Sequence, residues 1–367
     1  MVGRAFVHVG LPKTATTYLQ TILWSNRDVV ARHGLLLPGR ERRDHLWSSR
    51  VVREDDARKP RPEREHEAWR RVVADAAAWS GDVLLSHEFF AACSPRQAAE
   101  VVAALAPAEV HVLVTAREPL GLFTASWQES LKNRSTTPIE EYGTEESSSS
   151  QVIWDWRTLD LRLVLQRWSE AVPAERIHVL PLDPGAARDE IWQRFASVVA
   201  VPADAVDLGE SFPNESMGVV EAELLRRVNE HLGSFHSAFD RGVYIRTFLA
   251  DERLVPRGGE RFWPTPAQVE QCRERGDRAV AYLAEHAFDV VGDADLLRVP
   301  AELPARRTPD TVSDAELVDA AAELIATLLA DVRELREAGG AGSGGGATAA
   351  SRGLPGRPRW RTRRSGR

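Results

Sequence analysis

The sequence predicts an α/β fold with a central parallel β-sheet flanked by helices and a helical C-terminal part. Short apolar runs rich in β-branched residues, near 6–9, 81–86, 110–116 and 176–180, alternate with stretches of helical periodicity. Strands that alternate with helices in this way connect by right-handed crossovers and pair in parallel. Beyond residue 213 the apolar pattern is helical, which predicts the C-terminal part.

The N-terminal segment predicts a strand, a turn and a helix in succession. The apolar strand at 6–9 leads into Gly10 and Pro12, which favour a turn, and an amphipathic helix follows over 14–25. Backbone N–H groups at such a helix N-terminus lack partners, and with the helix dipole they bind phosphate or sulfate. We therefore expect an anion site in this turn.

Lys13 stands in this turn and is expected to supply a positive charge to the anion. Of the 47 basic residues only three are lysines, Lys13, Lys59 and Lys132. A chain so rich in arginine keeps lysine where a compact ammonium is needed. The turn is not a Walker A loop, because the run from Gly10 to Thr14 lacks a second glycine before the lysine.

The next two strands are separated by a helix. A charged stretch over 40–67 predicts a loop and helices at the mouth of the site, and a strand follows at 81–86. Ser94 and Pro95 predict the cap and first residue of a helix. The third strand, 110–116, is short enough for a buried parallel strand.

The remaining elements follow from periodicity and capping signals. The capping box Ser313-Asp314-Ala315-Glu316 predicts the start of the last helix. The expected segments are a helix at 124–132, a helix at 155–171, a strand at 176–180, and helices at 189–200, 216–232, 266–287 and 313–337.

Two motifs at strand ends resemble those of one enzyme family. Pro12-Lys13-Thr14-Ala15-Thr16-Thr17 is similar to the 5′-phosphosulfate loop of sulfotransferases that use 3′-phosphoadenosine 5′-phosphosulfate (PAPS). Arg117-Glu118-Pro119, directly after the third strand, resembles the family's 3′-phosphate motif. The family has a serine about eight residues after this arginine. Here that position is Ala125, flanked by Thr124 and Ser126. The sequence leaves open which of these two hydroxyl residues takes the place of the family's serine.

The resemblance to bacterial, actinobacterial-type sulfotransferases implies a fold and an activity. It implies a P-loop-like three-layer fold and transfer of a sulfuryl group from PAPS to a hydroxyl or amine by in-line displacement, with no metal required. The acceptor class is a small molecule or a glycan. The residues implied to bind PAPS are Pro12, Lys13, Thr14, Ala15, Thr16, Thr17, Tyr18 (against adenine), Arg117 and Ser126. Two alternatives are a P-loop nucleotide kinase and a non-catalytic nucleotide-binding module.

Sulfuryl transfer also needs a group that takes the proton of the acceptor. His87 follows the second strand in a Leu-Leu-Ser-His setting that resembles the catalytic histidine of cytosolic sulfotransferases. Glu88 is a rival, since carbohydrate-type relatives use a glutamate. His45, after the first helix, is a third candidate. Lys13 is expected to act on the bridging oxygen, and the sequence leaves the choice of base open.

Composition limits the partners. The formal net charge is −7, although residues 338–367 carry seven arginines and no acid, so the folded part is acidic and not expected to bind nucleic acid. No signal-peptide pattern and no run of 18 apolar residues is present, which predicts a cytoplasmic protein without membrane contact. The predicted parts are a sulfotransferase domain over 1–300, a helical extension over 301–337 and a disordered Gly-rich and Arg-rich tail over 338–367. The oligomeric state is left open.

Overall fold

The computed structural model describes residues 3–54, 60–143, 146–209 and 216–341. The chain divides into two compact units, one extending to Leu317 and one beginning at Val318. The boundary falls inside the last helix, α13 (Asp314–Ala341). The tail predicted over 338–367 lies outside the described residues from 342 on, whereas residues 338–341 are helical.

The first unit is built on a parallel β-sheet, as the sequence predicts. Its strand order is β2-β3-β1-β4-β5-β6, and every pairing is parallel. The strands are β1 Arg4–His8, β2 Leu35–Leu36, β3 Asp82–Ser86, β4 Glu109–Ala116, β5 Ile177–Pro181 and β6 Asp289–Val290. The two-residue strands β2 and β6 at the sheet edges were not predicted, because neither is long enough to show a strand pattern.

Strand β1 lies at the centre of the sheet. Val7 pairs with Leu85 of β3 on one side and with Val112 of β4 on the other. Strands β2 and β3 lie on one side of β1, and β4, β5 and β6 lie on the other, so the direction of the strand connections reverses beside β1. In open parallel sheets the crevice at such a reversal, beyond the carboxyl ends of the strands, is where ligands bind.

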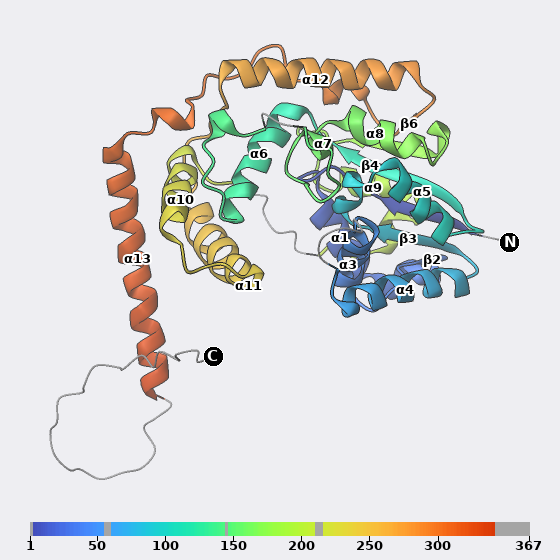
Figure 1. Cartoon of the computed structure of the whole chain (residues 1–367), viewed down its shortest axis with the longest axis horizontal. Coiled ribbons are helices and arrows are strands. Elements are labelled where there is room, and N and C mark those ends of the chain that lie inside the picture. The colour runs from blue at the N-terminus through green and yellow to red at the C-terminus, as the bar shows by residue number, and fades with distance from the viewer. Residues whose placement is uncertain (1–2, 55–59, 144–145, 210–215, 342–367) are drawn as a thin grey trace, which may run out of the picture. The chain divides into compact units, whose positions relative to one another are not determined.

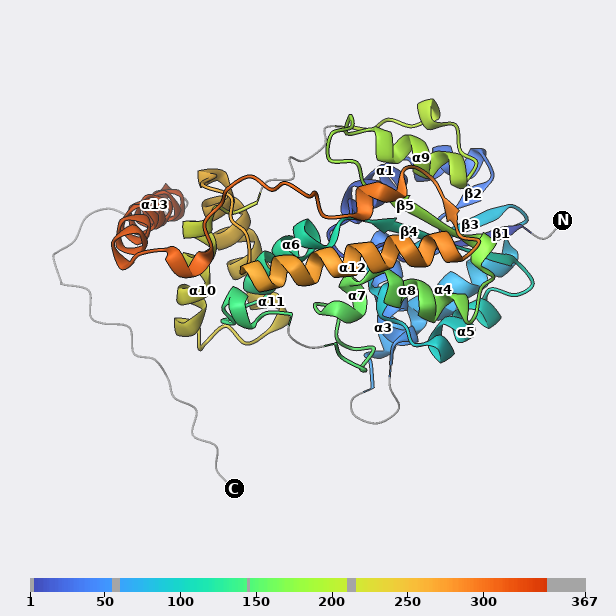
Figure 2. The same cartoon turned by 90° about the horizontal axis from the view of Figure 1, so that it is seen from above.

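Helices cover both faces of the sheet (Figure 1). Helices α1 and α9 lie on one face, while α5, α8 and α12 lie on the other (Figure 2). The helices before α13 are α1 Thr16–Ser25, α2 Arg27–Arg32, α3 Arg42–Val52, α4 Glu63–Ala78, α5 Pro95–Ala104, α6 Pro119–Lys132, α7 Trp156–Leu159, α8 Leu161–Ser169, α9 Glu190–Val198, α10 Val219–His231, α11 Ala238–Asp240 and α12 Pro266–Glu285. No helix in the described ranges is long and apolar enough to cross a membrane.

The core joins α1 and α9 to the sheet. Phe6, Leu84 and Leu113 of the strands pack with Leu19 of α1 and Phe195 of α9, and all five side chains are buried. Burial of apolar side chains on this scale is the main stabilising contribution to such a fold. The same packing fixes the direction in which α1 leaves the sheet edge.

The predicted helices differ from the observed ones mainly at their ends. The helix predicted over 155–171 is two helices, α7 and α8, because Asp155 and Asp160 each accept a backbone N–H and begin a new helix. Helix α6 begins at Pro119, five residues before the predicted start, with Glu118 as its N-cap. The capping box of Ser313 and Glu316 is present as predicted.

One helical segment has an unusual geometry that the sequence did not reveal. Residues Arg241–Leu254 (η5) form a π-helix of 14 residues. π-Helical turns are uncommon, rarely exceed one turn, and are frequent at functional sites. Lys132, at the end of α6, forms an ion pair with Asp251 of η5 at 2.5 Å, which ties the two elements together.

Candidate functional site

The predicted anion loop connects β1 to α1 at the carboxyl edge of the sheet. The N–H of Leu11 still donates to Thr115 O of β4 at 2.9 Å. The chain then turns at Lys13 and Ala15, whose φ angles of 67° and 60° both lie in the left-handed region. That conformation costs a non-glycine residue about 1–2 kcal/mol, and residues held in it cluster at ligand-binding sites.

Helix α1 begins with backbone amides that have no partner among the described residues. Its N-cap, Ala15, provides no side-chain acceptor, and the first backbone bond runs from Leu19 N–H to Ala15 O at 3.1 Å. Within the described part of the chain, the N–H groups of residues 15–18 have no acceptor. By contrast, α5 and α12 begin with capping boxes at Ser94 and Thr265. The loop therefore presents unpaired donors at the positive end of a helix dipole.

A buried chain of hydrogen bonds runs beneath the loop. Thr14 Oγ1 donates to Leu11 O at 2.5 Å and lies 2.8 Å from Thr115 Oγ1. His8 Nε2 lies 3.1 Å from Thr115 Oγ1, and His8 Nδ1 lies 2.8 Å from Ser86 Oγ. Every group finds a partner if His8 donates from Nε2 and accepts at Nδ1. These hydrogen bonds fix the loop to the ends of β1, β3 and β4.

His8 is neutral in this arrangement. It is completely buried, and burial lowers the pKa of its imidazole to about 4. Gly10 makes the close packing around it possible, since a Cβ there would lie less than 3.0 Å from Thr115 Oγ1, Thr16 Cγ2 and His8 Nε2. His8 was not among the predicted site residues. The signal that sequence analysis passed over is a lone polar residue at the end of an apolar strand, immediately before the loop.

Lys13 extends from the loop to a buried carboxylate on α6. Its Nζ lies 3.2 Å from Glu129 Oε2, and its side chain is 37% exposed. The other oxygen, Glu129 Oε1, forms an ion pair with Arg246 Nη1 of η5. Burial alone would raise the pKa of Glu129, but Lys13, Arg246 and Lys132 together hold it below its usual value. Glu129 is therefore an anion placed beside the loop cation.

Arg117 follows β4, the strand next to β1. Its Nε lies 3.5 Å from Glu118 Oε1, and its side chain is 37% exposed. Both carboxylate oxygens of Glu118 accept from the N–H of Gly121 at 2.8 Å. A Cβ at Gly121 would overlap with Arg117 Nη2. Arg117 thus folds against the first turn of α6 and keeps part of its guanidinium accessible.

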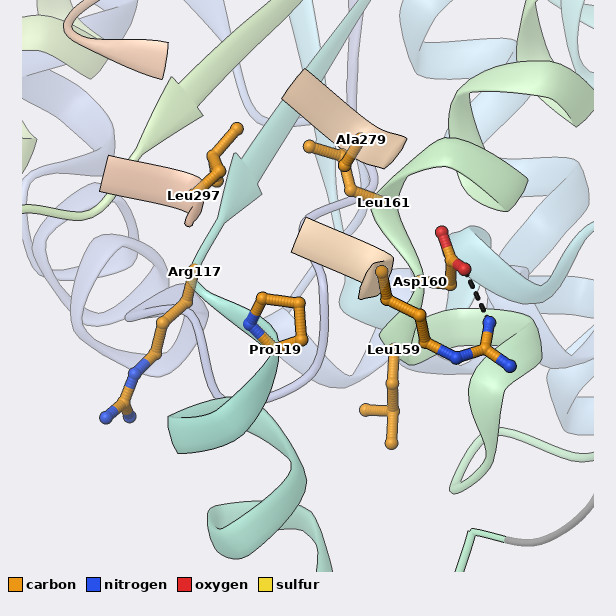
Figure 3. A pocket seen from close by; sticks show the side chains of 8 residues that line it. Arg117, Pro119, Leu159, Asp160, Leu161, Ala279 and Leu297 are labelled. Atoms are coloured by element: carbon orange, nitrogen blue, oxygen red, sulfur yellow. Dashed lines mark hydrogen bonds and ion pairs between the residues drawn. The ribbon is translucent and has the colours of Figure 1, made fainter. Parts of the chain in front are cut away.

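The cavity beside Arg117 is a packing void. It holds about 10 Å³, room for about one water molecule. Figure 3 shows the guanidinium of Arg117 pointing away from the other lining side chains. Inside, Asp160 accepts from Arg275 Nη1 at 2.5 Å. A nucleotide does not fit here, so the void is not the candidate site.

Ser126 and Thr124, the two candidates for the hydroxyl partner of Arg117, lie in different environments. Ser126 is fully buried, and its hydroxyl lies 2.5 Å from the hydroxyl of Tyr142. Thr124 is half-buried and donates to Leu120 O at 2.9 Å. Because Ser126 is engaged in the core, Thr124 is the better placed of the two to meet a ligand.

His45 is held on both ring nitrogens. Its Nδ1 accepts from the N–H of Ser86 at 3.1 Å, and its Nε2 donates to Pro38 O at 2.8 Å. It is fully buried, and burial lowers its pKa to about 4. The ring lone pair of His45 is occupied by the N–H of Ser86, so His45 connects α3 to β3. It has no free ring nitrogen with which to take a proton from an acceptor substrate.

His87 is partly engaged. Its Nδ1 accepts from the N–H of Phe89 at 3.1 Å and so caps the 3₁₀-helix η1 (Glu88–Ala92). The proton of a neutral ring then sits on Nε2, which makes His87 a donor at its free edge. Burial is the main reason that its pKa falls to about 4, assisted by Arg53 and Arg42.

Glu88 lies at the same strand end and remains ionised. Burial alone would raise its pKa, but His87, its own backbone N–H and Arg42 hold it below the usual value. Its Oε2 lies 3.5 Å from Gln20 Nε2, and Arg42 Nε donates to Gln20 Oε1 at 2.9 Å. The carboxylate, 20% exposed, is the best-placed acceptor of a proton among the three predicted candidates.

Tyr18 lies in the first turn of α1 and packs partly against the core. Its ring is half-buried, and the guanidinium carbon of Arg188 lies 5.5 Å from the ring centroid. An aromatic face with a cation beside it suits stacking of a purine base. Thr17 is exposed beside Tyr18, whereas Pro12, Thr14 and Thr16 are buried and shape the loop.

Comparisons of the chain with protein-family models, with curated proteins and with solved structures found no match.

Proposed function

We propose that this protein is a PAPS-dependent sulfotransferase that acts on a hydroxyl or amine of a small molecule or glycan. The observation that carries the proposal is the loop from Gly10 to Thr17. It presents amides without a partner in the described ranges, and Lys13, at the carboxyl end of the central strand, where the strand order reverses. The same loop carries the six residues that resemble the phosphosulfate motif.

The residues around the loop fit the donor PAPS. The amides of residues 15–18 and Lys13 would hold its 5′-phosphosulfate, and the exposed part of Arg117 would hold its 3′-phosphate. Tyr18 and Arg188 would receive the adenine. Bound there, PAPS supplies an activated sulfuryl group on a phosphate leaving group.

Glu88 is the proposed base. As the acceptor oxygen or nitrogen bonds to sulfur, its proton passes to the Glu88 carboxylate and the bond from sulfur to the phosphate oxygen breaks. Lys13 would stabilise the charge that develops on that oxygen. His87, with its proton on Nε2, would act as a donor beside the acceptor.

A calorimetric titration tests the proposal against its alternatives. We expect 3′-phosphoadenosine 5′-phosphate (PAP) to bind in the presence of EDTA, and PAPS to be consumed with an accepted substrate. Binding of ATP with Mg²⁺ but not of PAP would indicate a nucleotide kinase instead. Tight PAP binding without consumption of PAPS would indicate a non-catalytic nucleotide-binding module.

A further inference from the structure

The carboxylate of Glu129 occupies a place suited to a ligand anion. It is 5% exposed and accepts from two cations that come from different elements, Lys13 of the loop at 3.2 Å and Arg246 of η5. Both cations are about one-third exposed, Lys13 at 37% and Arg246 at 34%. A mobile anion that reaches the loop therefore meets the same two cations that Glu129 holds.

The positions of these three residues differ from those of an ordinary structural ion pair. Lys13 has a strained left-handed backbone, and Arg246 lies in a π-helix of 14 residues. Both are uncommon conformations that proteins retain mainly at functional sites. By comparison, Glu223 of α10 is 7% exposed and also bonds two arginines, Arg226 and Arg227, but all three belong to one regular helix.

We propose that Glu129 is a built-in counter-ion that competes with the ligand for Lys13, and that Arg246 is a further cation of the anion site. When a phosphate or phosphosulfate group binds at the loop, Lys13 and Arg246 turn from Glu129 to the ligand. The empty site then keeps its cations paired, and only an anion with two or more charges displaces the carboxylate. This inference rests on the proposed function for the identity of the ligand, but not for the presence of the anion site.

The direction in which one substitution changes the affinity for anions tests the inference. Glu129→Gln removes the competing charge and keeps the shape, so we expect it to bind inorganic pyrophosphate and PAP about tenfold or more tightly than the wild type. Arg246→Ala is expected to weaken both ligands about tenfold or more, because a charge-assisted contact is lost. Glu223→Gln is the matched control and should leave both affinities unchanged.

Each outcome separates the inference from the proposed function. Equal or weaker pyrophosphate binding by Glu129→Gln, with its unliganded melting temperature within a few degrees of the wild type, would overturn the inference and show that Glu129 positions Lys13. If Glu129→Gln unfolds, the affinities of Arg246→Ala for pyrophosphate and PAP decide alone. Affinities equal to those of the wild type would then overturn the inference. Pyrophosphate binding that responds as expected without any PAP binding would support the inference and refute the proposed nucleotide.

An independent observation concerns helix α13 in the second unit. Five of its large apolar side chains are 45–72% exposed, and from Ile325 on they recur every three or four residues. These residues are Val318, Ile325, Leu329, Val332 and Leu335. A stripe of this kind on a helix indicates a face that packs against another helix.

The order of residues on this face fits a second copy of the same helix. The exposed Val318, Ile325 and Val332 fall on the first position of a seven-residue repeat, and the exposed Leu335 falls on the fourth together with the half-buried Ala321 and Leu328. β-Branched residues at the first position with leucine at the fourth favour parallel two-stranded coiled coils. In that register Asp331 of one copy stands opposite Arg336 of the other, so the flanking charges are complementary.

We infer that α13 pairs with α13 of a second copy in a parallel coiled coil. Three heptads give only moderate affinity, so the oligomeric state must be measured at high protein concentration. Sedimentation equilibrium of the full chain at about 50 μM should give a dimer. Ile325→Asp should give a monomer, while Thr327→Asp, on the opposite face, should not. Asp331→Arg and Arg336→Asp should each weaken the dimer, and the double swap should restore it.

Several results would overturn this inference. A wild-type monomer at that concentration would mean that the stripe packs within its own chain or meets another partner. A dimer that survives Ile325→Asp would place the interface elsewhere. Failure of the double swap to restore the dimer would rule out the parallel register, because antiparallel helices bring like charges together.

Discussion

Lys13 is the residue at which a positional role and a chemical role can be told apart. If its ammonium stabilises charge on the oxygen that bridges phosphorus and sulfur, its benefit arises mainly in the transition state. Lys13→Ala should then lower kcat about 10²-fold or more, by analogy with loss of one electrostatic stabiliser. Lys13→Arg should recover little, because a planar guanidinium cannot occupy the same point. Steady-state kinetics with PAPS check this, and a preserved kcat in Lys13→Arg with only KM altered would contradict it.

The choice between Glu88 and His87 can be tested by the same kinetics. Glu88→Gln keeps the shape and the contact with Gln20 but cannot take a proton, so kcat should fall by about 10²-fold or more. His87→Asn should have the smaller effect on kcat, because the imidazole lone pair is already used by Phe89 N–H. His45→Asn serves as the control for a buried histidine that does not touch the acceptor. A larger loss in His87→Asn than in Glu88→Gln would assign the base to His87.

At the scale of the element, the first turn of α6 positions Arg117. Alanine normally stabilises a helix relative to glycine by about 1 kcal/mol. At Gly121 we expect the opposite sign, because a Cβ would displace the ends of the Arg117 and Glu118 side chains, and loss of the Glu118 cap costs about 0.5–2 kcal/mol. Gly242 of η5 is the matched control, since a Cβ there meets nothing within 4 Å.

Two measurements check the role of this turn. Gly121→Ala should lower the melting temperature and weaken PAP, while Gly242→Ala should do neither. Arg117→Ala should weaken PAP by about 1.5–3 kcal/mol and weaken adenosine 5′-phosphosulfate, which lacks the 3′-phosphate, much less. Equal losses for both nucleotides would mean that Arg117 does not contact the 3′-phosphate.

The main elements of the sheet could be predicted because each carries its own local signal. The strands at β1, β3, β4 and β5 are apolar runs, and the helix start at Ser94 has a capping box. The break between α7 and α8 could not be predicted from periodicity, because it depends on the caps at Asp155 and Asp160.

The candidate site was only partly predictable, for a different reason. The loop and Arg117 are contiguous motifs, but the contact of Lys13 with Glu129 joins residues 116 positions apart. His8 meets Thr115 across 107 positions. Such contacts arise only when parallel strands bring their carboxyl ends together, and no spacing in the sequence indicates which polar residues will meet there.

At the scale of the whole molecule, three buried histidines make stability depend on pH. His8, His45 and His87 all have pKa values of about 4, against an ordinary value of 6.5, chiefly because of burial. Between these values the unfolded chain binds protons that the folded chain does not, so stability falls as pH is lowered from about 6.5 to about 4. Each histidine contributes up to about 1.4 kcal/mol per pH unit in this window.

Urea denaturation at pH 7.5, 6 and 5 measures this dependence. We expect stability to be greatest at pH 7.5 and to fall at each step. His45→Asn should reduce the steepness of the fall, whereas His33→Asn, at an exposed position, should leave it unchanged. Stability that is constant between pH 7.5 and 5 would mean that these rings are protonated in the folded state.

A crystal structure of the complex with PAP tests directly whether the loop binds the 5′-phosphate of the nucleotide. We expect the 5′-phosphate within hydrogen-bond distance of the amides of residues 15–18 and of Lys13 Nζ, and the 3′-phosphate at Arg117. A nucleotide bound away from the loop, or one whose 5′-phosphate leaves those amides unpaired, would contradict this expectation.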